Sequence, residues 1–124
     1  MGNFKELIVW QKAKDLAVKI YQITDSGSYC KDYGLKDQMT RAAVSIPSNI
    51  AEGAERDSTK EFIRYLHIAK GSAAELKTQL YIAHRVNLVP ENDHQEIIAN
   101  LQLLSRKIHC LINYLKNNDL RHKA

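Results

Sequence analysis

Apolar residues recur at alternating spacings of four and three along four segments of the chain, and this repeat restricts the possible folds most strongly. The first segment runs through Val9, Ala13, Leu16, Ile20 and Ile23. Such a repeat places one apolar seam along a helix, and helices of this kind pack at about 20° to one another. We therefore predict an all-α, antiparallel up-and-down four-helix bundle. The expected helices span residues 7–25, 34–54, 59–86 and 91–117.

The supply of turn-forming residues agrees with long helices joined by short loops. Only five glycines and two prolines occur in 124 residues, too few for the many turns of a β-sandwich. Ser58 followed by Glu61 is a capping box, which predicts a helix starting at residue 59. We expect a single domain over residues 1–117, followed by a frayed basic tail at 118–124.

The chain carries no recognisable signal for secretion or membrane insertion. Its first residues lack the apolar stretch of a signal peptide, and no apolar run reaches the length of a membrane span. Cys30 and Cys110 are too few for a disulfide framework or a four-cysteine zinc site. We expect a cytoplasmic protein with reduced cysteines and no membrane contact.

A proline stands inside the second expected helix. Pro47 removes one backbone hydrogen bond and clashes with the carbonyl of Ala43, at a cost of about 3 kcal/mol. The segment can break into two helices there or continue as one kinked helix. We favour the kinked helix, because Ile46 and Ile50 carry the apolar seam across the proline. Gly71 costs about 1 kcal/mol relative to alanine in the third helix, so we expect close packing against the second helix there.

Four stretches of the sequence form a recognisable pattern. They are Trp10–Ala13, Gln38–Gly53, Lys60–Phe62 and Ala69–Leu80. This pattern resembles the family called four helix bundle protein, or 23S rRNA-intervening-sequence protein. The resemblance implies an up-and-down four-helix bundle, a ring-like homopentamer and no established catalytic activity.

The same resemblance suggests partners. Similar proteins are encoded in intervening sequences of bacterial ribosomal RNA genes. Another relative, the accessory protein of diversity-generating retroelements, binds nucleic acid and a reverse transcriptase. The resemblance therefore implies self-association, with RNA or DNA, or a protein such as a reverse transcriptase, as further partners.

Polar residues on the second and third expected helices form the first candidate site. Their spacings place four of them on one face of the second helix and two on one face of the third. We predict a hydrogen-bonded structural network in which the arginine pairs with one or both carboxylates, because an unpaired buried carboxylate is costly. The predicted members are Arg41, Ser45, Asn49, Glu52, Glu75 and Gln79.

Catalysis is the alternative interpretation of these carboxylates. Glu52 and Glu75 are candidates for the acid and base of an uncharacterised hydrolase, since paired carboxylates with separated pKa values support hydrolysis. No nucleophile motif or glycine-rich phosphate loop accompanies them. We therefore predict no catalytic residue and no cofactor. A di-iron site needs two Glu-x-x-His motifs, and the chain has one, Glu91–His94, outside mid-bundle, so we also predict no metal site.

Basic residues form the second candidate site. The net charge is +4, and the excess lies on the first and third expected helices. A solvated outer face is the simpler explanation, whereas cyclic assembly would multiply the positive field and favour salt-dependent binding to phosphates. An oligomeric scaffold that binds a protein partner is the alternative function. The candidate nucleic-acid contacts are Lys12, Lys19, Arg64, Lys70 and Lys77.

Overall fold

The computed structural model describes residues 3–25 and 32–118. After a short 3-10 turn, η1 (Phe4–Glu6), these residues form α1 (Ile8–Thr24), α2 (Tyr33–Ala54), α3 (Thr59–Arg85) and α4 (Glu91–Asn118). No strand occurs within the described ranges. The predicted all-α four-helix bundle is confirmed, and every predicted helix end lies within one residue of the observed end.

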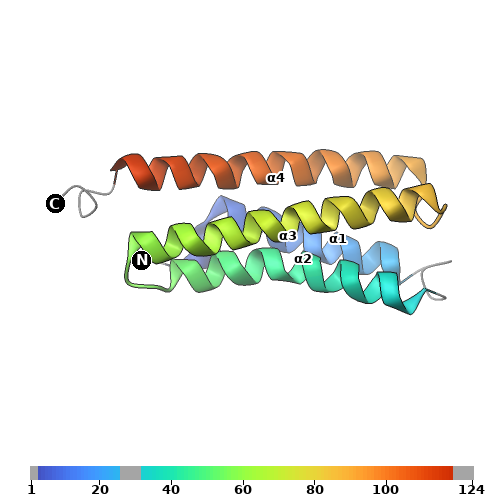
Figure 1. Ribbon diagram of the computed structural model, residues 1–124, viewed down its shortest axis with the longest axis horizontal. Helices are drawn as coiled ribbons and strands as arrows, with labels where there is room; N and C mark the ends of the chain where they lie inside the picture. Colours follow the sequence, from blue (N-terminus) through green and yellow to red (C-terminus); the bar gives the residue numbers. More distant parts are fainter. Residues whose placement is uncertain (1–2, 26–31, 119–124) are drawn as a thin grey trace.

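The helices lie side by side along one long axis (Figure 1). Around the bundle, α1 packs on α2, α2 on α3 and α3 on α4, and α4 returns to α1. The α2–α3 pair packs most closely and the α1–α4 pair least closely. In Figure 1 the sequence colours run in alternate directions along successive helices. Because the helices pack in this cyclic order, the α1–α4 edge lies on the opposite side of the bundle from the α2–α3 edge.

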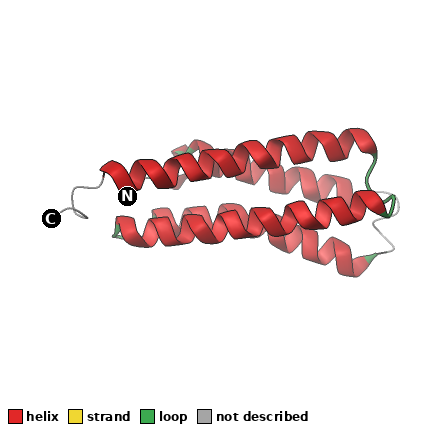
Figure 2. Ribbon diagram, turned by 45° about the horizontal axis from the view of Figure 1, so that its top comes forward, coloured by secondary structure: helices red, strands yellow, loops and turns green. Residues whose placement is uncertain are grey.

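The apolar seams meet in one core. The helices that contribute to it run alongside one another in Figure 2. Its largest fully buried side chains are Ile20, Met39, Ile46, Ile50, Leu66, Leu76, Leu80, Ile97, Leu101, Leu104 and Ile108. All four helices contribute to this set, so burial of the seams holds the bundle together. None of the described helices is long and apolar enough to span a membrane.

Helix α2 continues through its proline. Pro47 lies inside the helix, which ends only at Ala54, so a break into two helices does not occur. Ile46 and Ile50, on either side of the proline, are both completely buried. Burial of this seam offsets the missing backbone bond. The kink itself stays a prediction.

Gly53 of α2 and Gly71 of α3 have different surroundings. A Cβ at Gly53 would lie 2.7 Å from the Cβ of Tyr65 and 3.0 Å from Cδ1 of Phe62, so this glycine permits α2 to approach α3. A Cβ at Gly71 would meet no atom of the described chain within 4 Å. The predicted close packing of Gly71 against α2 is therefore wrong, because the residue lies on the exposed side of α3.

Local hydrogen bonds define the helix ends. Ser58 Oγ accepts from the backbone N–H of Glu61 at 3.0 Å, which confirms the predicted start of α3. After α3, Asn87 adopts a left-handed φ of 64°, and Leu88 N–H donates to the carbonyl of Ala83 at 2.9 Å. This arrangement is a common way to end a helix. Cys30 and most of the predicted tail lie outside the described residues.

Candidate nucleic-acid interface

The centre of the predicted polar network lies between α2 and α3. The hydroxyl oxygens of Ser45 and Ser72 are 2.8 Å apart, and Asn49 Nδ2 donates to the carbonyl and the hydroxyl of Ser45, at 2.8 and 3.0 Å. Ser45 thus contacts α3 through Ser72, whereas Asn49 bonds to Ser45 within α2. Their partner on α3 is Ser72, which the sequence analysis had not included.

The predicted ion pair of Arg41 is wrong. Its Nε donates to Asp37 Oδ2 at 2.8 Å, one turn back along α2, and the side chain is 79% exposed. Glu52 lies eleven residues further along the same helix, about 16 Å away at the α-helical rise, beyond reach of the guanidinium. Glu75 is exposed on α3 and forms no ion pair within the described chain. Glu52 and Glu75 are both exposed to solvent, so neither carboxylate needs an arginine partner to offset burial.

Glu52 belongs to a different cluster near the α2–α3 loop. Arg56 Nη2 donates to Glu52 Oε1 at 2.9 Å and to the hydroxyl of Tyr65 at 2.8 Å. The hydrogen bond with Glu52 raises the pKa of Arg56, and the electrostatic effect of Tyr65 adds to it. Glu52 is exposed, and neither it nor Glu75 lines the grooves described below. The two carboxylates form no shared site, so this arrangement gives the hydrolase hypothesis no support.

The remaining predicted member of the network, Gln79, lies in the interior. It is only 8% exposed, and its Oε1 has no hydrogen-bond partner in the described part of the chain. The Gln79 amide is therefore buried in the bundle, whereas the Arg41 side chain is exposed on α2. The six predicted residues thus do not form one hydrogen-bonded network. Ser45 and Asn49 bond to each other, and the other four lie in separate surroundings.

The basic residues of α3 and α4 come together in a groove. It has a volume of about 470 Å³, and the described residues that line it include three cationic side chains and no carboxylate. Lys70 Nζ also lies 3.2 Å from His109 Nδ1 of α4. The described residues that line it are Lys70, Ala73, Ala74, Lys77, Leu101, Gln102, Ser105 and Arg106. We name this surface the basic groove.

Arg106 could be assigned to the basic groove only from the tertiary structure. Lys70 and Lys77 were predicted from their heptad spacing on α3, whereas α4 has equal numbers of acidic residues and of lysine plus arginine. The net charge of α4 therefore did not indicate that this helix contributes to a phosphate-binding surface. The packing of α4 against α3 places Arg106 beside the two lysines.

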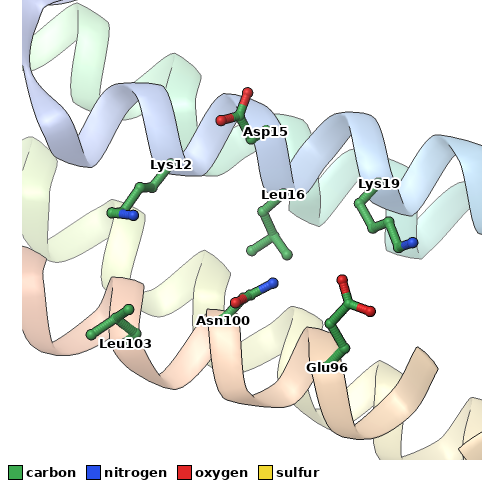
Figure 3. A pocket seen from close by; sticks show the side chains of 7 residues that line it. All are labelled: Lys12, Asp15, Leu16, Lys19, Glu96, Asn100 and Leu103. Atoms are coloured by element: carbon green, nitrogen blue, oxygen red, sulfur yellow. The ribbon is translucent and has the colours of Figure 1, made fainter. Parts of the chain in front are cut away.

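The other predicted basic residues have acidic neighbours. Lys12 and Lys19 line a groove of about 300 Å³ between α1 and α4, together with Asp15 and Glu96 (Figure 3). Arg64 donates to Glu61 through Nε at 3.1 Å, and this bond lowers the pKa of the carboxyl group. Nearby carboxylates weaken the attraction of these three cations for a polyanion. Among the five predicted contacts, Lys70 and Lys77 are best placed to bind phosphate.

A cluster of histidines closes the α3–α4 end of the bundle. His94 is 6% exposed and stacks on His84, with ring centroids 4.1 Å apart, while His84 Nε2 forms a short hydrogen bond with Glu91 Oε2. Burial lowers the pKa of His94, and the neighbouring His84 imidazole lowers it further. Within the described residues, no group of three or more His, Cys, Asp or Glu side chains is arranged to hold a metal ion. The two stacked imidazole rings therefore contribute to the packing of α3 against α4 at this end.

The fold and the basic groove define the class of protein: an all-α four-helix bundle with a cationic groove between α3 and α4. The family of the 23S rRNA-intervening sequence protein matches residues 5–110, and the chain belongs to this family.

A solved structure supports the fold. The chain is similar to a protein with unknown function from the S23 ribosomal protein family of Bacteroides thetaiotaomicron, with a TM-score of 0.78 and 24% sequence identity. The match covers 85% of this chain and 98% of that one. At this identity the likeness establishes the fold alone. No curated protein matches the chain.

Proposed function

We propose that this protein is a non-enzymatic, self-associating cytoplasmic accessory protein that binds the phosphate backbone of RNA or DNA. The basic groove is the observation that carries the proposal. Lys70, Lys77 and Arg106 line it with no carboxylate among its described residues, and Gln102 and Ser105 add polar groups that can donate to phosphate oxygens. Lysine and arginine at such a surface displace counterions, which gives affinity with little preference for base sequence.

Three points support a backbone ligand in preference to base recognition. The groove lies between two straight helices, so its cations form a linear array. Lys70 and Lys77 stand one heptad apart, about 10 Å along the helix axis. Among the residues that the structure describes there, no aromatic ring is available for a base to stack on. Self-association would repeat this array and strengthen binding through multivalency.

Salt dependence tests the proposal. Binding of a labelled single-stranded RNA is measured by fluorescence anisotropy across a potassium chloride series. Each phosphate contact contributes about 0.7 to the slope of log affinity against log salt for single strands. The triple variant Lys70→Ala, Lys77→Ala, Arg106→Ala should therefore reduce the slope by about 2 for each groove engaged.

A charge-matched variant provides the control. Lys14→Ala, Arg64→Ala and Lys116→Ala together remove the same net charge outside the groove and should leave most of the slope intact. Equal losses in the two triple variants would refute the groove as the binding site. Absence of binding by the wild-type protein at low salt would refute the function, and it would favour the alternative of a scaffold for a protein partner.

A further inference from the structure

A shallow apolar hollow lies on α3 just beyond the basic groove. It has a volume of about 440 Å³, and the described residues that line it are Thr78, Tyr81, Ile82, Arg85 and Val86. Three of these side chains, Tyr81, Ile82 and Val86, are 48%, 50% and 55% exposed. Single exposed apolar residues are ordinary on a protein surface, whereas a cluster of them indicates a surface for a ligand or partner.

The hollow continues the line of the basic groove along α3. Tyr81 follows Lys77 by four residues, so the two side chains stand on the same face of the helix, about 6 Å apart along its axis. Thr78, directly after Lys77, lines the hollow. A ligand that lies along Lys70 and Lys77 therefore reaches the hollow without leaving α3.

The aromatic ring of Tyr81 is supported by the histidines of α3 and α4. It makes an edge-to-face contact with the ring of His94, with the centroids 5.0 Å apart and the planes at 73°. His94 is itself buried and stacks on His84. The Tyr81 ring is thus held by packed neighbours while about half of the residue stays open to solvent. A fixed, accessible aromatic ring of this kind is what an unpaired nucleobase stacks on.

A ligand that fits both surfaces must combine phosphates with flat apolar groups. Single-stranded RNA or DNA does so, because its charged backbone carries bases whose faces are free to stack, whereas a duplex keeps these faces inside its own helix. We infer that the basic groove and the hollow together bind a single strand. Its phosphates lie along Lys70, Lys77 and Arg106, and one of its bases stacks on Tyr81.

This inference rests on the proposed function and names the class of its ligand as single-stranded nucleic acid. Every base has a face that can stack, so a base on Tyr81 adds affinity without selecting a sequence. Arg85, which lines the hollow, supplies a further cation for the phosphate that follows the stacked base.

An abasic strand separates the base contact from the phosphate contacts. Fluorescence anisotropy compares labelled oligothymidylate with a strand of the same length made only of abasic sites. Tyr81→Leu keeps an apolar side chain next to His94 and should weaken binding of oligothymidylate by about fivefold to a hundredfold, the range for loss of one stacked base. Its affinity for the abasic strand, its affinity for a duplex and its salt slope should not change, because no cation is removed. Tyr114→Leu, at an exposed tyrosine of α4 outside both surfaces, should bind every ligand as the wild type does.

A variant that keeps an aromatic ring provides the second measurement. Tyr81→Trp should retain the affinity for oligothymidylate. Trp10 is the single tryptophan of the sequence, so the fluorescence added by this substitution reports on the hollow. Bound oligothymidylate should quench the added fluorescence, and the bound abasic strand should leave it unchanged.

The outcomes distinguish this inference from the proposed function. A wild type that binds the abasic strand as tightly as oligothymidylate would overturn the base contact and leave the phosphate-binding groove in place. The same conclusion would follow if Tyr81→Leu bound oligothymidylate like the wild type, or lost affinity equally for both strands. A wild type that binds neither strand at low salt would overturn the proposed function together with this inference.

Discussion

Replacement of Gly53 by alanine should destabilise the bundle, although the same change inside an ordinary helix is stabilising. Alanine gains about 1 kcal/mol over glycine in a helix interior. At Gly53, however, the new Cβ would lie 2.7 Å from the Cβ of Tyr65 and 3.3 Å from the carbonyl oxygen of Phe62. Neither atom can rotate away, because both are fixed by the α3 backbone. The two helices would have to separate.

The net effect follows from these two opposing contributions. Overpacking of a well-packed interior costs about 1–3 kcal/mol, and contacts with backbone-fixed atoms place this site near the upper end. After the gain in helix propensity, about 1–2 kcal/mol of destabilisation remains. For a chain of this size the melting temperature should fall by about 3–8 °C.

Circular dichroism melting at a fixed protomer concentration measures this effect. Fixed concentration is needed because the proposed self-association would couple stability to concentration. Gly34→Ala provides the control, since its new Cβ would have only Asp32 Oδ1 nearby, at 3.9 Å. This variant should melt at or slightly above the wild-type temperature. A Gly53→Ala protein as stable as the wild type would refute the close approach of α2 and α3 at this point.

Three further changes should alter stability in defined ways. Leu66→Ala removes a fully buried side chain and should cost about 2–5 kcal/mol in a urea titration; a loss below 1 kcal/mol would contradict its core position. Ser58→Ala removes the cap of α3 and should cost about 1 kcal/mol, whereas Ser58→Asp should retain most of the stability. The lowered pKa of His94 means that the unfolded chain binds the proton more readily, so stability should fall as pH drops below about 6.5. His94→Leu should flatten that part of the stability–pH profile, and an unchanged profile would exclude His94 as its source.

The fold could be predicted because its signals are local. The four–three spacing of apolar residues predicted the helices, and local hydrogen bonding predicted where they begin and end. Ser58, for example, caps α3 by accepting from the backbone N–H of Glu61, three residues away. The seam across Pro47 also predicted correctly that α2 would continue. Each of these relations spans a few turns of one helix, where sequence spacing translates directly into direction in space.

The polar residues could not be assigned in the same way. Arg41 and Glu52 share a helical face, but their separation along the axis exceeds the reach of a side chain. Arg41 instead pairs with Asp37, one turn back on the same helix and outside the predicted network. Shared direction on a helix is therefore a weak guide to pairing when a carboxylate one turn away is available.

By itself, the sequence determined an all-α chain of four helices, their ends and the family to which they belong. Tertiary structure alone decided which helical faces meet. Packing of α3 against α4 joined Arg106 to Lys70 and Lys77, and packing of α2 against α3 enclosed Gly53 while Gly71 stayed exposed. The physical reason is that helix formation depends on contacts within a few residues, whereas a groove depends on the rotation and register of two helices that are far apart in sequence.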